Sequence, residues 1–211
     1  RWRGADGAVR EERFAKVLVA AGRRPNVEGL GLETTGLALD AKGVPVVDTG
    51  TTQCGDAPVF LAGDVDGNLP LLHEASDEGR IAGANAMRWP AVERHERRTP
   101  LAIAFTDPQM AMVGRRHADL PAGRHAIGTV SFADQGRARV MARNRGIARL
   151  YGETGSCRLL GAELFGPNAE HLAHLLAWAV QDGMTVQRAL AMPFYHPVLE
   201  EGLRTAMAPG A

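Results

Sequence analysis

Apolar residues in the first part of the chain come in short runs, and these runs predict strands of a buried sheet. The runs at 15–22 (AKVLVAAG) and 58–64 (PVFLAGD) are almost continuously apolar and close on Gly or Gly-Asp. This pattern is typical of parallel strands that are covered on both faces. The run at 44–48 (VPVVD) contains a proline, which cannot donate to a ladder, so it is predicted as an edge or opening strand. Small residues through 74–87 predict a helix that closely approaches a sheet or a ligand.

The pattern changes after a charged, proline-bounded segment at 89–100, which is the predicted domain boundary. Beyond it, short β-rich runs alternate with Gly, Pro, Asp or Asn turns and predict an antiparallel meander. The runs are LAIAF, MAMVG, HAIGTVSF, GRARVMA, GIARLYG and CRLLGAELFG. The C-terminal part is predicted to be helical: Asn168 can cap one helix, Thr185 a second, and Pro197 opens a third that ends at Ala206. The predicted fold is therefore an α/β first half followed by an α+β domain.

Composition limits the class of protein. Among 211 residues, Lys plus Arg and Asp plus Glu each number 24, and the resulting zero net charge argues against a non-specific nucleic-acid binder. No apolar run is long enough to predict a transmembrane helix. The two cysteines, Cys54 and Cys157, have no metal-binding or redox spacing, so free thiols and a cytoplasmic location are expected.

Three clusters receive ordinary structural interpretations. Five arginines flank the predicted turn at 144–146 and are expected to form the solvated face of a hairpin; they are Arg137, Arg139, Arg143, Arg145 and Arg149. His171 and His174 have no partner at a metal-ligand spacing, so no metal site is expected. A helical face of leucines and the β-rich sheet are expected to support self-association through residues 96–211, with Trp178 buried beside the leucines; these are Leu172, Leu175 and Leu176.

The first candidate for chemistry is the Gly63-Asp64 pair at the end of a predicted parallel strand. Open α/β sheets bind ligands in the crevice at this end of their strands. Gly63 allows close backbone approach, and Asp64 can accept hydrogen bonds from ligand hydroxyl groups. The alternative is a Gly-Asp turn with a solvated carboxylate, and this segment alone favours that alternative.

The second candidate is FYHPVLEE at 194–201, where His196 precedes a predicted helix. A histidine held at this place and oriented by a carboxylate suits a general base. Helical spacing favours Glu200 as the partner, but His196 precedes the helix, so Glu201 stays open. The alternative is a capping histidine with acidic residues that stabilise the helix dipole. A third stretch, FTDPQMAMVG at 105–114, predicts a hairpin turn and by itself indicates no chemistry.

Taken together, these stretches resemble the C-terminal half of the flavoprotein disulfide reductases, the pyridine nucleotide-disulfide oxidoreductases. VLVAAGRRPN is similar to the exit from the family's NAD(P) domain, and VPVVD, TTQ and VFLAGDV are similar to its second FAD motif. AFTDPQMAMVG resembles the opening of its dimerisation domain, and MPFYHPVLEE resembles its C-terminal His-Pro…Glu motif. The four motifs follow the family's order and span nearly the whole chain.

The resemblance implies cofactor contacts in the first half. Asp64, which follows Gly63, matches the aspartate that hydrogen-bonds the ribityl chain of FAD. The segment of Leu71, Leu72 and His73 matches the backbone that approaches the flavin ring. Leu61 departs from the family pattern, which often has alanine there.

The resemblance also implies catalytic roles near the C-terminus. His196 matches the acid–base histidine, and Glu201 matches the glutamate that orients it, which overrides the choice of Glu200. In this family the histidine serves the redox disulfide of the partner subunit, so a homodimer is implied. HPV at 196–198 replaces the commoner His-Pro-Thr.

Three domain portions are therefore expected: 1–24 as the tail of an NAD(P) domain, 25–95 as part of a Rossmann-like FAD domain, and 96–211 as the dimerisation domain. The intact protein is expected to pass electrons between a dithiol or disulfide and NAD or NADP through FAD. Within the family, the expected enzyme is a dihydrolipoamide dehydrogenase, with membership of a larger dehydrogenase complex. A glutathione reductase is the second choice. The redox cysteine pair and both GxGxxG loops are absent from these 211 residues, so little cofactor binding and no complete reaction are expected of this chain alone. The alternatives are a flavin-dependent transhydrogenase and a non-catalytic dimerisation module.

Overall fold

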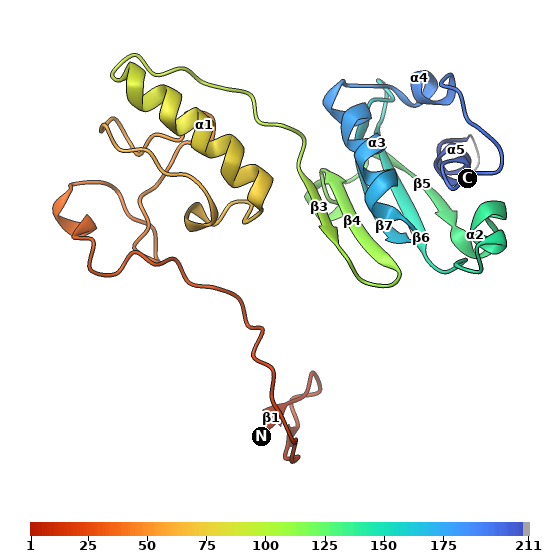
Figure 1. Cartoon of the computed structure of the whole chain (residues 1–211), viewed down its shortest axis with the longest axis horizontal. Coiled ribbons are helices and arrows are strands. Elements are labelled where there is room, and N and C mark those ends of the chain that lie inside the picture. Colours follow the sequence, from red (N-terminus) through yellow and green to blue (C-terminus); the bar gives the residue numbers. More distant parts are fainter. Residues whose placement is uncertain (209–211) are drawn as a thin grey trace. The chain divides into compact units, whose positions relative to one another are not determined.

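A computed structural model describes residues 1–208, which form two compact units that divide between His95 and Glu96. The first unit contains a small antiparallel pair of strands, β1 (Trp2–Arg3) and β2 (Val9–Arg10). It also contains two 3₁₀ turns, η1 (Leu32–Thr34) and η2 (Asp64–Asp66), and one long helix, α1 (Leu72–Arg88). Figure 1 shows α1 beside the irregular segments of its own unit.

The three strands predicted for the first unit do not form a sheet. The run at 15–22 is extended and exposed, with Val17 and Leu18 at 78% and 90% exposure, because no described strand pairs with it. Segments 44–48 and 58–64 make only isolated bridges, of which one joins Val47 to Cys54. A strand forms only where another segment pairs with it along its length. Here the neighbouring segments turn after a few residues, so each offers only a short stretch for pairing. The prediction of parallel strands from apolar runs is therefore wrong for these residues.

Helix α1 confirms the predicted helix and extends it at both ends. Its buried side chains are polar, namely those of Glu74, Glu78 and Asn85. The Asn85 amide donates to the carbonyl oxygens of Thr51 (2.9 Å) and Glu93 (2.8 Å) and accepts from the Glu93 amide (2.9 Å). Because a buried amide is stable only when its donors and acceptor are satisfied, Asn85 ties two loops to the helix.

The second unit is built on a five-stranded antiparallel sheet with the order β3-β4-β7-β6-β5. Its strands are β3 (Leu101–Ala104), β4 (Gln109–Gly114), β5 (His125–Ser131), β6 (Ile147–Glu153) and β7 (Leu159–Gly166). Short 3₁₀ turns, η3 (His117–Asp119) and η4 (Phe132–Asp134), lie between strands. The antiparallel prediction is confirmed, but the simple meander is wrong because β4 pairs with β7. Local apolar patterns mark strands without specifying partners that are distant in sequence.

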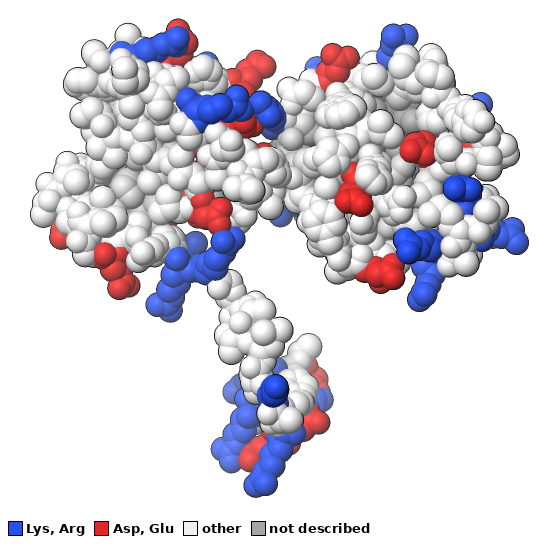
Figure 2. Space-filling view, viewed as in Figure 1, with Lys and Arg blue, Asp and Glu red and all other residues white. Residues whose placement is uncertain are grey.

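The run GRARVMA forms a helix, α2 (Gly136–Val140), instead of a strand. Its buried side is a single alanine, Ala138, and the Gln135 side chain caps its first turn. The prediction that the arginines around it lie on one hairpin face is therefore wrong. Figure 2 shows Lys and Arg side chains close to Asp and Glu side chains on the visible face, consistent with the zero net charge.

Three helices complete the second unit: α3 (Ala169–Gln181), α4 (Val186–Leu190) and α5 (Glu201–Met207). The Thr185 cap is confirmed, since its hydroxyl accepts from the Arg188 amide at 3.2 Å. Asn168 occupies the N-cap position in a left-handed conformation without a side-chain cap bond. The last helix begins at Glu201 and not at Pro197, because its first backbone hydrogen bonds run from the amides of Gly202 to Arg204 to the carbonyl oxygens of Leu199 and Glu200.

The core of the second unit lies between the sheet and its helices. Helix α3 contacts β3, β4 and β7, whereas α5 contacts β5 and β6 (Figure 1). Leu172 and Leu176 of α3 are buried in this core, so they do not form the predicted self-association face. The prediction that Trp178 is buried is wrong: it is 68% exposed, because it lies on the side of α3 away from the sheet. Only Leu175 of the three predicted leucines is exposed.

Candidate functional site

The Gly63-Asp64 pair lies where an extended segment turns into η2. Gly63 has φ 86° and ψ −167°, a conformation that favours glycine, and its amide donates to Glu78 Oε2 of α1 at 2.6 Å. The carboxylate of Asp64 is partly exposed and lies 2.6 Å from a guanidinium nitrogen of Arg23. The carboxylate is thus held at the surface by a cation, where a ligand hydroxyl group can also reach it.

The N-terminus of α1 follows the same loop. Leu71 is the N-cap residue and has no side-chain cap, and Leu72 and His73 occupy the first turn with exposed side chains. The first amides of an α-helix have no acceptor within the helix. The Leu71 amide donates to the carbonyl oxygen of Leu69 at 2.7 Å, whereas the amides of Leu72 and His73 can donate hydrogen bonds to acceptor atoms of a ligand.

The second set of predicted residues is brought into direct contact in the other unit. His196 Nδ1 lies 3.0 Å and 3.1 Å from the two carboxylate oxygens of Glu201. Glu201 also accepts a hydrogen bond from the Val198 amide at 3.1 Å. The Glu200 side chain contacts no described residue through a hydrogen bond or ion pair. The structure therefore places the fifth residue after His196 against the imidazole, and not the fourth that helical spacing favours.

The exposure of the two side chains differs in a way that suits proton transfer. The His196 side chain is 80% exposed, whereas Glu201 is 28% exposed at the first turn of α5. The hydrogen bond from His196, and next the bond from the Val198 amide, lower the pKa of Glu201 from its ordinary value of 4.5. An ionised Glu201 holds the Nδ1 side of the ring, which leaves Nε2 free to exchange a proton with a substrate.

Leu199 and Leu203 anchor this segment to the core, at 6% and 5% exposure. A Cβ on Gly128 of β5 would overlap the carbonyl oxygen of Ala206, so α5 lies directly against that strand. The rigid part of the site is thus the start of α5, and the imidazole projects from the loop that precedes it.

Sequence reasoning missed three residues that organise these sites: Arg23, Glu78 and Gln135. Glu78 carried a usable signal, since a carboxylate on the packed side of a predicted helix needs a donor. Gln135 carried none, because its partner, the carbonyl oxygen of Val198, lies 63 positions away. Arg23 belongs to the GRRPN turn, but no local pattern indicates its pairing with Asp64.

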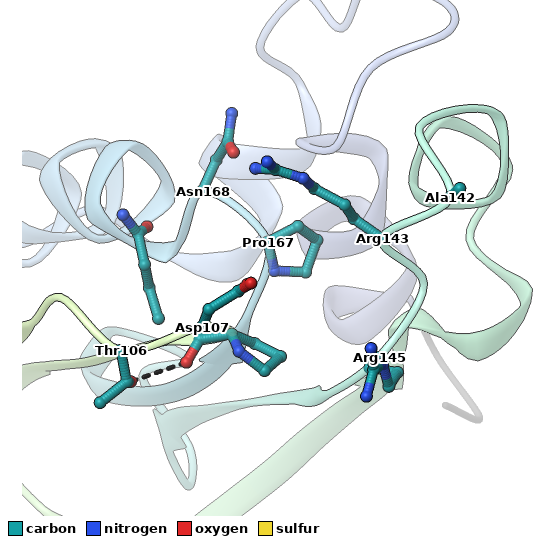
Figure 3. A pocket seen from close by; sticks show the side chains of 9 residues that line it. Thr106, Asp107, Ala142, Arg143, Arg145, Pro167 and Asn168 are labelled. Atoms are coloured by element: carbon teal, nitrogen blue, oxygen red, sulfur yellow. Dashed lines mark hydrogen bonds between the residues drawn. The ribbon is translucent and has the colours of Figure 1, made fainter.

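The stretch at 105–114 forms the predicted hairpin turn between β3 and β4. One side of a polar cavity of about 410 Å³ is formed by this turn, with the Arg143 loop and the start of α3 on the other sides (Figure 3). The Thr106 hydroxyl donates to the carbonyl oxygen of Pro108 at 2.7 Å and stiffens the turn. The cavity holds neither His196 nor Glu201.

Two further classes of site have no support within residues 1–208. No group of three or more possible ligands that could hold a metal ion is present in the described part of the chain. His174 Nδ1 lies 2.7 Å from the carbonyl oxygen of Glu170, and His171 lies beside the Glu170 carboxylate, so both contact their own helix. No described helix combines the length and the apolar character needed to cross a membrane.

Known proteins match almost the whole chain. Residues 5–79 match the pyridine nucleotide-disulphide oxidoreductase family, and residues 101–207 match its dimerisation domain. A mercuric reductase of Acidithiobacillus ferrooxidans is 34% identical over 93% of this chain and 36% of its own length. Dihydrolipoyl dehydrogenase 2 of Haloarcula marismortui is 33% identical over 96% and 43%, and the mitochondrial dihydrolipoyl dehydrogenase of Rattus norvegicus is 33% identical over 90% and 37%. The chain thus spans about two fifths of the length of these relatives.

Solved structures agree with this match. LpdA from Mycobacterium tuberculosis is 28% identical and superposes with a TM-score of 0.74 over 87% of this chain and 40% of its own. The flavoprotein disulfide reductase RclA from Escherichia coli, at 23% identity, shares the fold with a TM-score of 0.76 over 91% of this chain and 44% of its own. With a dimerisation-domain match over more than half of its length, the chain belongs to the pyridine nucleotide-disulfide oxidoreductase family, the class I flavoprotein disulfide reductases.

Proposed function

We propose that this chain is the C-terminal part of an FAD-dependent, NAD(P)-linked disulfide oxidoreductase, and that dihydrolipoamide is its dithiol substrate. The observation that carries the proposal is the His196–Glu201 contact at 3.0 Å on an exposed loop. A carboxylate at Nδ1 of an exposed imidazole is the arrangement that suits a general base. The names of two of the relatives described above support the choice of dihydrolipoamide.

In this function His196 moves the thiol proton. A thiolate, and not a thiol, attacks a disulfide sulfur, so the substrate S–H must first lose its proton. Nε2 of His196 accepts that proton, while Glu201 at Nδ1 fixes the tautomer and stabilises the imidazolium that forms. When the reaction reverses, the same nitrogen returns the proton to the leaving thiolate.

The residues of the first unit fit FAD. The Asp64 carboxylate is accessible for the ribityl hydroxyl groups, and the amides of Leu72 and His73 in the first turn of α1 suit the acceptor atoms of the flavin ring. When bound, FAD supplies the two-electron chemistry between a nicotinamide and a dithiol or disulfide. Arg23 limits the freedom of Asp64, and Glu78 fixes the peptide of Gly63 in front of it.

The functional unit is proposed to be a homodimer, because the second unit is a dimerisation domain by its family match. Each His196 would then serve the redox disulfide of the partner subunit. Membership of a larger dehydrogenase complex and a cytoplasmic location remain expectations from the sequence. A glutathione reductase-like activity and a flavin-dependent transhydrogenase are the alternatives that keep this fold, and a non-catalytic dimerisation module is the alternative without chemistry.

The test uses a full-length protein that contains this chain, purified with its flavin. Oxidation of dihydrolipoamide coupled to reduction of NAD, followed by absorbance, should exceed glutathione reduction by NADPH. The transhydrogenase alternative predicts hydride exchange between the two nicotinamides without any dithiol turnover. A protein that contains no flavin and turns over neither dithiol nor nicotinamide would support the dimerisation module and contradict the proposal.

A further inference from the structure

The loop that carries His196 has few polar attachments to the rest of its unit. Between Met192 and the start of α5, this loop bonds to the neighbouring helices through the Met192 amide, the His196 and Val198 bonds to Glu201, and a cation–π contact of Phe194 with Arg204. The hydrogen bond that ties the loop to a segment distant in sequence is the one from Gln135 to the Val198 carbonyl. Leu199 adds an apolar anchor at 6% exposure. Val198 is therefore the residue at which a hydrogen bond holds this loop to the segment before α2.

Gln135 uses both ends of its side-chain amide. Its Nε2 donates to the carbonyl oxygen of Val198 at 2.7 Å, and its Oε1 accepts from the Ala138 amide at 2.7 Å. Because a backbone amide can only donate and a carbonyl can only accept, this orientation of the Gln135 amide satisfies both partners. One side chain thus caps α2 and holds the histidine loop.

The stem of Gln135 also lies against α5. A Cβ built on Gly202 would meet Gln135 Cγ at 3.6 Å, which is ordinary contact distance. Glu201 precedes Gly202 directly, so Gln135 lies close to the start of α5. The amide of Val198, in the peptide plane before its carbonyl group, donates to Glu201 at 3.1 Å.

We propose that Gln135 is a positioning residue for the His196–Glu201 pair and acts through the backbone of Val198. Gln135 holds the carbonyl group of Val198, and the amide of the same residue, in the preceding peptide plane, donates to Glu201, which in turn holds Nδ1 of His196. The catalytic meaning of this chain of bonds rests on the proposed function. The arrangement of the bonds does not, and it can be tested without any reaction.

Two substitutions separate the Val198 contact from the helix cap. Gln135→Asn keeps an amide that caps α2, because asparagine is a preferred N-cap residue, but its side chain is one carbon shorter and cannot reach Val198. Gln135→Met keeps the length and the contact with Gly202 but removes both hydrogen bonds. Glu200→Gln is the matched control, since that carboxylate has no hydrogen-bond partner among residues 1–208.

The first measurement is the titration of the Glu201 carboxyl carbon by NMR in the 211-residue chain. The Val198 amide helps to lower the pKa of Glu201, so loss of the Gln135 bond should raise that pKa toward its ordinary value in both variants. Glu200→Gln should leave it unchanged. A shift in Gln135→Met alone would assign the effect to the α2 cap and overturn the proposal, as would an unchanged pKa in both.

The second measurement is kinetic and uses the full-length protein with its flavin. Gln135→Asn should lower kcat for dithiol oxidation roughly tenfold with little change in KM, because a displaced base affects the reaction more than binding. Normal kcat together with a shifted Glu201 titration would show that the bonds exist but do not position the base. If the wild-type protein oxidises no dithiol, the proposed function fails, and the titration still decides the role of Gln135 in the structure.

Discussion

At the scale of single residues, the site depends on which carboxylate reaches an imidazole. Regular helical spacing favours Glu200, but the helix begins at Glu201, so the loop from His196 to Glu200 follows a different path. The Val198 amide donates to the Glu201 carboxylate, and this hydrogen bond holds the loop from Val198 to Glu201 in a tight turn. The position of the carboxylate is therefore a property of the loop, which spacing rules for helices do not describe.

The roles of these residues can be separated by three substitutions in a full-length protein. His196→Gln should lower dithiol oxidation by about 10²–10⁴-fold, because glutamine keeps the size but cannot accept the thiol proton. Glu201→Gln should have a smaller effect, since it removes orientation and charge but not the base. Glu200→Gln should be nearly silent. Steady-state rates with flavin content as the folding control would decide this, and a larger loss for Glu200 than for Glu201 would contradict the assignment.

The Glu201 contact should also make stability depend on pH. Its pKa in the folded chain is lowered by the His196 hydrogen bond and next by the Val198 amide, so ionised Glu201 favours the folded state. This contribution is present above the ordinary value of 4.5 and is lost as the pH falls through the lower folded value. Urea unfolding of wild type and Glu201→Gln should therefore differ at neutral pH and converge in acid. A constant difference across this range would argue against the contact.

Asp64 is expected to bind cofactor and not to support the core. Its carboxylate is partly exposed and, among residues 1–208, pairs with a surface arginine, Arg23. In the full-length protein, Asp64→Ala should weaken FAD retention by about 1.5–3 kcal/mol, the range for a lost hydrogen bond to a charged group. Asp56→Ala, an exposed aspartate on a neighbouring turn, is the control. Equal flavin content in both variants after dialysis would disprove the role of Asp64.

At the scale of elements, the antiparallel strands and α3 were predictable from their local apolar patterns, and α1 from its small residues. The failures arise where the apolar pattern of a segment does not by itself decide its structure. The run at 15–22 has the pattern of a buried strand, yet no described strand pairs with it. The segment at 136–140 has a strand-like alternation but forms α2, because Gln135 caps it and Ala138 is buried. The contact of His196 with a carboxylate followed from the resemblance, whereas its support by Gln135 required the structure.

The packing of α5 on β5 gives a prediction at this scale. Gly128→Ala should destabilise the chain by roughly 1–3 kcal/mol, because the new Cβ overlaps the backbone oxygen of Ala206 and one element must move. The control is Gly136→Ala in α2, where a Cβ meets nothing within 4 Å and helix propensity favours alanine. Thermal unfolding of both variants tests this. Equal melting temperatures would mean that β5 and α5 are separated more widely than described.

At the scale of the whole molecule, one face of α3 is buried in its own unit and the opposite face is not. Leu172 and Leu176 lie in the core, whereas Leu175 is 44% and Trp178 is 68% exposed. Large exposed apolar side chains on a dimerisation domain are typical of a surface that a second copy covers. The predicted self-association is thus retained, but its surface shifts from the leucine stripe to the outer side of α3.

We therefore expect the chain to form a dimer in which Trp178 is buried against the second copy. Trp178→Glu should weaken the dimer by at least about tenfold, since an interface tryptophan contributes strongly and an unpaired buried carboxylate is unfavourable. Trp89→Glu is the matched control, because Trp89 is 44% exposed but lies in the other unit. Light scattering across micromolar concentrations measures both. A monomeric wild type would contradict self-association itself, whereas equal dimer masses for the two variants would place the contact on another surface, such as the open side of the sheet around Met110 and Phe165.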